Sequence, residues 1–178
     1  MLTMASYDDG KLQIVDWIQR TFEPGSTCLD VGACDGKWAR LIGDHMVMDA
    51  CEVWKPNIVE YHLPDLYRRV YACSISALPY DWYDLIIFGD VIEHMSVEDA
   101  QSVLRYAKSR CRDMIIGVPF LYQQDELYGN PYERHIQDDL TDELFRVRYP
   151  GFTILLEARK DYFYYHKDPR GPIAPLCG

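Results

Sequence analysis

Short apolar runs recur along the chain, and segments with helical periodicity separate them. The runs cover Thr27–Val31, Met46–Cys51, Val70–Cys73, Tyr83–Phe88 and Met114–Val118. Each run is short and almost continuously apolar, as expected for a strand that is buried on both faces. Strands that alternate with helices predict a parallel sheet covered by helices on both sides.

The segments between and around these runs supply the helices. Apolar residues recur at helical spacing from Lys11 to Phe22, and a short helix is expected over 38–42. Ser96 opens a further helix with a capping-box pattern. Near the end of the chain, strand-like runs over 153–158 and 161–166 are separated by two residues only, which permits an antiparallel hairpin and no helical crossover.

The length and composition suit one domain. At 178 residues, with 48% hydrophobic and 26% charged residues, we expect a single globular domain over 1–178 with its core at about 27–166. No apolar stretch approaches the roughly 20 residues of a membrane helix. Residues 1–10 lack the basic start and apolar centre of a signal peptide. The sequence therefore predicts a cytoplasmic protein that does not interact with membranes.

Charge and cysteine spacing exclude some classes of function. The six cysteines show no C-x-x-C spacing, so they are interpreted as reduced, packed side chains rather than a zinc knuckle or redox pair. A net charge of -10 disfavours nucleic-acid binding, which depends on clustered Lys and Arg. A small-molecule ligand is therefore expected, and a homodimer is allowed.

The longest irregular stretch covers 119–139 and is rich in Tyr, Gln, Asp, Glu and His. Long loops in compact domains often bind ligands. We expect the substrate to be held by this loop, by the N-terminal helix or by a partner chain. The tail over 168–178 contains three prolines and two glycines and is predicted to be extended or disordered.

A glycine-bearing turn follows the first predicted strand, in Leu29-Asp30-Val31-Gly32-Ala33-Cys34-Asp35-Gly36. Its G-x-x-x-G spacing alone is weakly specific. A carboxylate at Asp30 would repel a pyrophosphate and attract an ammonium group, which favours S-adenosylmethionine (SAM) over a dinucleotide. Glu52 follows sixteen residues after Gly36 and suits two ribose hydroxyls, although NAD enzymes use the same device.

Taken in order, the motifs LDVGACDG, ACEVW, VYACSISALPY, YDLIIFGDVIEHM and IIGVP resemble those of the class I SAM-dependent methyltransferases over about residues 27–166. The resemblance implies a Rossmann-like, doubly wound, mostly parallel seven-stranded α/β sheet with a C-terminal antiparallel hairpin. It implies a cofactor site with Asp30, Gly32 and Gly36 at the methionyl part, Glu52 at the ribose, and Ser74 with Ile75 at the adenine. Ala33, Val53 and Asp90 complete the expected cofactor set.

Two positions depart from the family pattern. Cys34 stands where the family usually has glycine, and Ser74 stands where many members have an aspartate that binds the adenine amino group. Serine keeps a hydroxyl but loses the charge. We expect weaker cofactor binding rather than its loss.

The segment after the fourth predicted strand supplies the candidate reactive groups. Asp90, Glu93 and His94 would share a face if the chain turns helically there, and His135 lies in the long loop. The pattern resembles methyltransferase subgroups in which E-x-x-E-H and a later histidine hold a divalent metal. Here Asp90 replaces the first glutamate, which puts metal geometry in doubt.

Three interpretations of these residues stay open. In the first, His94 or His135 acts as a general base, and Glu93, His94 and His135 form the catalytic set. In the second, these residues bind a metal that holds two acceptor hydroxyls. In the third, they only orient loops near the cofactor. A methyltransferase acting on an oxygen or nitrogen of a small molecule, such as a sugar, phenol or biosynthetic intermediate, is expected first. A metal-assisted diol or catechol O-methyltransferase, a non-catalytic SAM-binding adaptor and an NAD(P) oxidoreductase are the alternatives.

Overall fold

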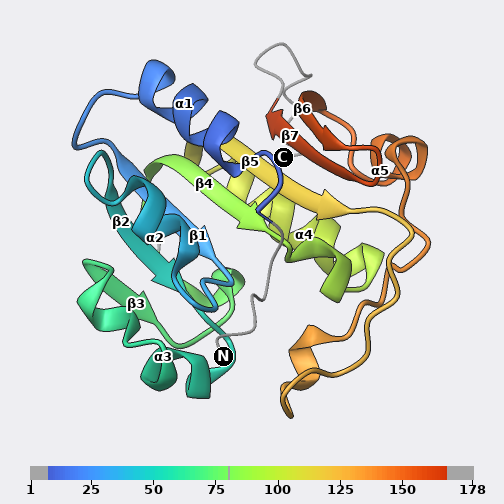
Figure 1. Cartoon of the computed structure of the whole chain (residues 1–178), viewed down its shortest axis with the longest axis horizontal. Coiled ribbons are helices and arrows are strands. Elements are labelled where there is room, and N and C mark those ends of the chain that lie inside the picture. Colours follow the sequence, from blue (N-terminus) through green and yellow to red (C-terminus); the bar gives the residue numbers. More distant parts are fainter. Residues whose placement is uncertain (1–7, 80, 168–178) are drawn as a thin grey trace, which may run out of the picture.

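A seven-stranded sheet forms the centre of the computed structural model, which describes residues 8–79 and 81–167. The strand order is β3-β2-β1-β4-β5-β7-β6 (Figure 1). The first five strands are parallel to one another, and β7 is antiparallel to both β5 and β6. Their bounds are β1 Thr27–Val31, β2 Val47–Cys51, β3 Arg69–Tyr71, β4 Tyr83–Gly89, β5 Cys111–Pro119, β6 Phe152–Arg159 and β7 Tyr162–Lys167. The predicted fold class is confirmed.

Helices cover both faces of the sheet because successive strand residues point to opposite sides. Cys28 packs with α1, α2 and α3 on one face, whereas Leu29 packs with α4 and α5 on the other. The helices are α1 Lys11–Thr21, α2 Lys37–Ile42, α3 Lys55–Glu60, α4 Val97–Lys108 and α5 Asp142–Arg148, and the short 3-10 helices are η1 Leu63–Asp65, η2 Ile75–Ala77, η3 Ile92–His94 and η4 Pro131–Glu133.

The predicted capping box starts α4. The Ser96 hydroxyl accepts a hydrogen bond of 3.1 Å from the Asp99 backbone N–H, which satisfies one of the free donors of the first turn. Ala100, Val103, Leu104 and Ala107 form the buried stripe of this helix. The start of α4 is thereby fixed at the carboxyl edge of β4.

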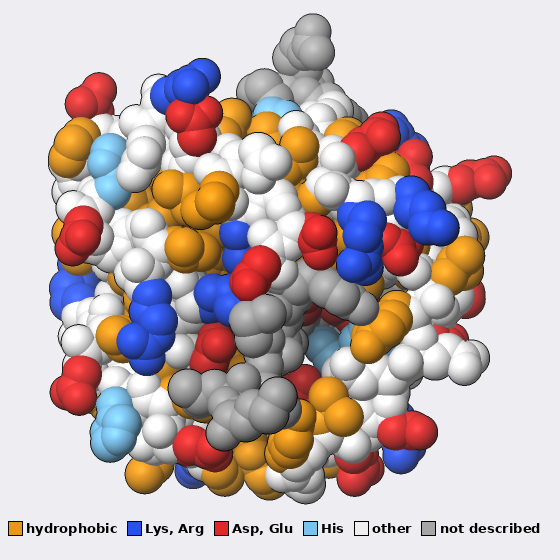
Figure 2. All heavy atoms as spheres, viewed as in Figure 1, with side chains coloured by type: hydrophobic (Ala, Val, Ile, Leu, Met, Phe, Trp, Pro, Cys, Tyr) orange, Lys and Arg blue, Asp and Glu red, His pale blue; other side chains and the backbone are white. Residues whose placement is uncertain are grey.

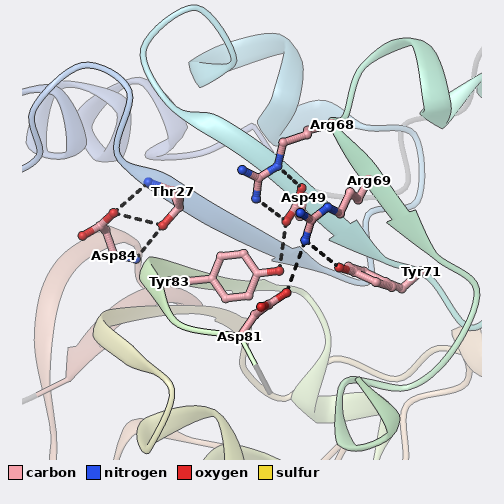
Figure 3. A network of polar contacts seen from close by, with 8 residues as sticks. All are labelled: Thr27, Asp49, Arg68, Arg69, Tyr71, Asp81, Tyr83 and Asp84. Carbon is pink, nitrogen blue, oxygen red and sulfur yellow. Dashed lines mark hydrogen bonds and ion pairs between the residues drawn. The ribbon is translucent and has the colours of Figure 1, made fainter. Parts of the chain in front are cut away.

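Polar contacts connect β1, β2, β3 and β4 away from the carboxyl ends of these strands, toward their amino ends (Figure 3). Asp49 is fully buried in β2, and Arg68 binds both of its oxygens at 2.9 and 2.6 Å. The Tyr83 hydroxyl donates to the same carboxylate at 3.0 Å. A buried charge requires such partners, so Asp49 fixes the arrangement of three strands.

The sequence predicted the core elements but not all of them. The opening helix and the C-terminal hairpin are confirmed, while the third strand is shorter than expected and ends at Tyr71, before Cys73. Helices α3 and α5 were not predicted. The predicted tail over 168–178 lies outside the described residues. Within the described ranges, no helix has the length and apolarity that crossing a bilayer requires.

Candidate functional site

A cavity of about 540 Å³ opens at the carboxyl edge of β1, β2 and β4, and the start of α4 and the 119–139 loop complete its walls. Ligands of open α/β sheets bind at this edge, and the size suits a small-molecule site. Figure 2 looks onto this side, where histidine and acidic side chains lie inside a recess. On the same face, Lys and Arg side chains are interspersed with acidic ones.

The turn after β1 forms one wall. Gly32, Cys34 and Gly36 all have left-handed backbone, with φ of 70°, 44° and 73°. A Cβ on Gly32 would lie 2.9 Å from Val91 Cγ2, so glycine permits the close approach of the two loops. Cys34, which departs from the family pattern, therefore has a side chain at a position whose backbone conformation favours glycine.

Glu52 lies at the end of β2, lines the cavity and is 4% exposed. Its carboxylate accepts hydrogen bonds from the backbone N–H groups of Cys34 at 2.9 Å and Trp54 at 2.7 Å. Burial raises the pKa of Glu52, and these N–H groups oppose the rise. The side chain is held in one orientation beside the glycine turn, as a ribose-binding carboxylate requires.

Asp30 does not occupy the expected place. It is 2% exposed, does not line the cavity and accepts a 2.5 Å hydrogen bond from the Tyr67 hydroxyl. Burial raises the pKa of Asp30 to about 7. Asp30 shares the face of β1 with Cys28, on the side that α1, α2 and α3 cover. Its expected attraction to a bound ammonium group stays a prediction.

Asp90, unlike Asp30, supplies a carboxylate to the cavity lining. It follows β4 with a left-handed φ of 57° and lines the cavity beside Gly89 and Trp38. Both carboxylate oxygens are shielded from solvent. Burial raises the pKa of Asp90, whereas the nearby Lys11 and the Tyr162 hydroxyl lower it.

Glu93, His94 and His135 form a compact cluster, and one ligand atom from each lies within 4.8 Å of the others. Asp90 is not part of this set. The predicted convergence of Asp90 with Glu93 and His94 on one helical face is wrong, because only Ile92–His94 forms a short 3-10 helix and Asp90 lies before it. The cluster instead joins η3 to the loop.

Backbone contacts fix the orientation of both histidines. His94 Nδ1 lies 3.2 Å from the Arg134 carbonyl, and His135 Nδ1 lies 2.7 Å from the Tyr122 carbonyl. A carbonyl only accepts, so these contacts favour the tautomer in which Nδ1 carries the proton and Nε2 keeps a lone pair. Burial lowers the pKa of His94 to about 4 and also lowers that of His135. Burial thus favours the neutral form of both rings.

Glu93 brings a buried carboxylate to the two rings. It is 1% exposed, and neither of its oxygens accepts a hydrogen bond of normal geometry from the described residues. Burial, and then the charge of Asp90, raises its pKa well above the usual range. The backbone N–H groups of Val91 and Glu93 oppose this rise only in part, and a carboxyl group at this depth favours a proton or a nearby cation.

The 119–139 loop is anchored to η3. The backbone N–H groups of Ile136 and Gln137 donate to the Glu93 carbonyl at 2.8 and 3.0 Å. Further along the loop, the Tyr132 ring lies 6.3 Å from that of Trp54, across the cavity mouth. The loop thus forms one wall of the cavity, and its expected role in holding a substrate stays a prediction.

The structure separates the predicted residues into two groups. Those that line the cavity are Gly32, Ala33, Glu52, Val53, Ser74, Asp90 and His94. Those that are not part of its lining are Asp30, Gly36, Ile75, Glu93 and His135. Gly36 has a packing role, because a Cβ there would lie 2.5 Å from Leu66 Cδ1.

Several cavity residues were missed. Lys37 and Trp38 follow the glycine turn, Asp99 and Ser102 lie on α4, and Glu133 lies in the loop. The capping box and the loop composition had drawn attention to these segments, but not to the residues that point inward. Which side of a helix faces a ligand depends on packing that the sequence pattern does not specify.

Comparison with solved structures assigns the architecture. A SAM-dependent methyltransferase from Clostridium acetobutylicum superposes with a TM-score of 0.69 at 13% identity, over 92% of each chain. The chain has the class I methyltransferase fold. Magnesium protoporphyrin IX methyltransferase from Synechocystis with bound SAM gives a TM-score of 0.62 at 15% identity, over 86% of this chain and 75% of that one.

A third similar structure of this methyltransferase fold contains ligands. It is the 1,6-didemethyltoxoflavin-N1-methyltransferase of Burkholderia thailandensis with bound 1,6-didemethyltoxoflavin and S-adenosylhomocysteine (SAH), with a TM-score of 0.60 at 18% identity over 90% of this chain and 78% of that one. No protein family model matches the sequence, and no curated protein matches it. At these identities the methyltransferase fold is what the chains share.

Proposed function

We propose that the protein is a SAM-dependent methyltransferase that acts on an oxygen or nitrogen of a small molecule. The observation that carries this proposal is the position of Glu52 within a methyltransferase fold. Its buried carboxylate lines the cavity and accepts a hydrogen bond from the Cys34 N–H in the glycine turn. Similar folds contain SAM or SAH. Two ribose hydroxyls can donate to the remaining lone pairs of Glu52.

The charges of the cavity suggest how SAM would lie. Asp90 and Lys37 line the same end of the cavity, and an amino-acid zwitterion needs one charge of each sign. The methionyl group would occupy this end, with its ammonium at Asp90. The ribose would then lie at Glu52, and the adenine at the opposite end near Ser74.

The acceptor would enter between the loop and η3. The Glu133 carboxylate, the Tyr132 ring and the imidazole of His94 line that part of the cavity. Methyl transfer is an in-line displacement at the sulfonium methyl, so positioning supplies much of the catalysis. Where the acceptor must lose a proton, the lone pair on Nε2 of His94 or His135 can receive it.

Calorimetric titration with SAH and SAM, followed by a screen of hydroxyl and amine acceptors, tests the proposal. We expect SAH to bind and at least one acceptor to be methylated. Tighter binding of NADH than of SAH would overturn it. SAH binding without turnover on any acceptor would favour a non-catalytic SAM-binding adaptor instead.

A divalent metal at Glu93, His94 and His135 is a second candidate, and one observation favours it. Three acceptor groups face one another within 4.8 Å, and the Glu93 oxygens are buried without a hydrogen-bond donor of normal geometry among the described residues. The imidazole–carboxylate set suits Zn²⁺, Fe²⁺ or Mn²⁺. A metal there would favour an acceptor with two adjacent hydroxyls and lower the pKa of one of them.

Titration of the purified protein with Mn²⁺ and Zn²⁺ tests this candidate without an activity assay. We expect one tight site that His135→Ala removes. His62→Asn is the matched control, because His62 is exposed and asparagine tolerates its φ of 52°. Equal metal binding by both variants, or turnover that persists after exhaustive chelation, would remove the metal from the mechanism.

A further inference from the structure

We propose that Asp99 accepts a hydrogen bond from the 6-amino group of the adenine and so selects adenosyl over other nucleosides. The inference rests on the proposed function. It concerns the end of the cavity opposite Asp90 and Lys37, where Ser74 stands in place of the aspartate expected from the family resemblance. Asp99 lines the same cavity but comes from α4, a different element.

Helix α4 and the segment that contains Ser74 are held together. The Tyr106 hydroxyl of α4 donates a 2.8 Å hydrogen bond to the Leu78 carbonyl, just after η2. Ser74 precedes η2, and its hydroxyl lies 3.1 Å from that of Ser76, which also lines the cavity. Asp99 and Ser74 therefore border one subsite from two sides, although 25 positions separate them in the sequence.

The Asp99 carboxylate is oriented before any ligand binds. Its Oδ2 accepts a hydrogen bond of 2.8 Å from the Ser96 hydroxyl, while the Asp99 backbone N–H donates to Ser96 Oγ at 3.1 Å. This reciprocal pair fixes the side chain against the first turn of α4. A carboxylate has about four lone-pair positions, so Oδ1 keeps acceptor capacity for a ligand.

The chemistry of this subsite fits a purine with an exocyclic amino group. Met95 and Val103, each four positions from Asp99 in the sequence, line the same cavity and give apolar contact to a flat ring. An exocyclic amino group is a donor only in this setting, and an ionised carboxylate is an acceptor only. A 6-oxo purine would instead present an oxygen to the carboxylate, which repels it. Asp99 thus restores the charge that Ser74 lacks.

Binding of two probes, SAH and its 6-oxo analogue S-inosylhomocysteine, tests the inference by calorimetry. We expect the wild-type protein to bind SAH at least about tenfold more tightly, as one hydrogen bond to a charged group would give. In Asp99→Asn, whose amide can donate to the 6-oxo group, we expect that ratio to fall to about threefold or less.

Glu98→Gln is the matched control, because Glu98 and Asp99 are both exposed neighbours on α4 but Glu98 does not line the cavity. This variant should keep the wild-type ratio, and thermal melts of the ligand-free proteins check that all three fold alike. An unchanged ratio in Asp99→Asn, with SAH binding intact, would overturn the role of Asp99 alone. Failure of the wild-type protein to bind either probe would overturn the proposed function.

Discussion

The backbone N–H of Cys34 donates a 2.9 Å hydrogen bond to the carboxylate of Glu52. This contact ties the turn after β1 to the end of β2. Glu52→Gln places an amide NH₂ group, which cannot accept, against one of the two backbone donors. Because hydrogen bonds to charged groups contribute roughly 1.5–3 kcal/mol, we expect SAH affinity to fall about tenfold. Calorimetry measures the change, and Glu60→Gln on exposed α3 should leave affinity unaltered.

The same contact survives in Cys34→Gly, because the donor is the backbone. Cys34 has a φ of 44°, a conformation that costs a residue with a Cβ about 1–2 kcal/mol and costs glycine little. The added freedom of glycine in the unfolded chain offsets part of this gain. We expect a net increase of about 0.5–1 kcal/mol in the free energy of unfolding, measured by urea titration. Cys34→Ala keeps the Cβ, so an equal gain in that variant would contradict the explanation.

Asp30 should make stability depend on pH. Burial raises its folded-state pKa to about 7, whereas the unfolded value is near 4. The folded state therefore holds a proton that the unfolded state has released, and stability is lost as pH rises from about 4 to 7. Asp30→Asn keeps an acceptor for Tyr67 and removes this loss. Relative to wild type, we expect it to gain on the order of 4 kcal/mol between pH 4 and pH 8.

Denaturant titrations at the two pH values measure the difference, and Asp16→Asn on the exposed side of α1 provides the control. A free-energy difference between Asp30→Asn and wild type that is constant with pH would show that Asp30 stays ionised in the folded protein.

The sequence predicted the sheet well because burial on both faces leaves near-continuous apolar runs. The site was harder to predict. Asp30 lies inside β1, in register with Ala50, whereas Glu52 lies two positions beyond Ala50, after the last residue of β2. Glu52 therefore reaches the cavity at the carboxyl edge of the sheet, and Asp30 does not line it. Helix α5 begins at Asp142 with a Thr141 cap, but its seven residues are too short for a clear periodic pattern.

The network in Figure 3 offers a matched pair of variants. Arg68→Met leaves the fully buried Asp49 with Tyr83 as its remaining side-chain donor among the contacts drawn there, so we expect a loss of about 2–4 kcal/mol. Arg69→Met removes an exposed ion pair with Asp81 and an exposed hydrogen bond to the Tyr71 hydroxyl, both at 3.3 Å, and should cost less than about 1 kcal/mol. Thermal or urea unfolding compares them. Similar losses in both variants would mean that Asp49 does not depend on Arg68.

Two substitutions of His94 separate its anchoring contact with the loop from the proposed role of Nε2 in turnover. Asparagine places an amide N–H near the position of Nδ1, so His94→Asn should keep the bond to the Arg134 carbonyl while it removes Nε2. If Nε2 receives a proton or binds a metal, turnover should fall about 100-fold or more, with SAH affinity and the protease resistance of the loop little changed. His94→Ala should lose both turnover and loop order. Full turnover in His94→Asn would restrict this residue to anchoring the loop and leave Nε2 of His135 as the remaining imidazole base.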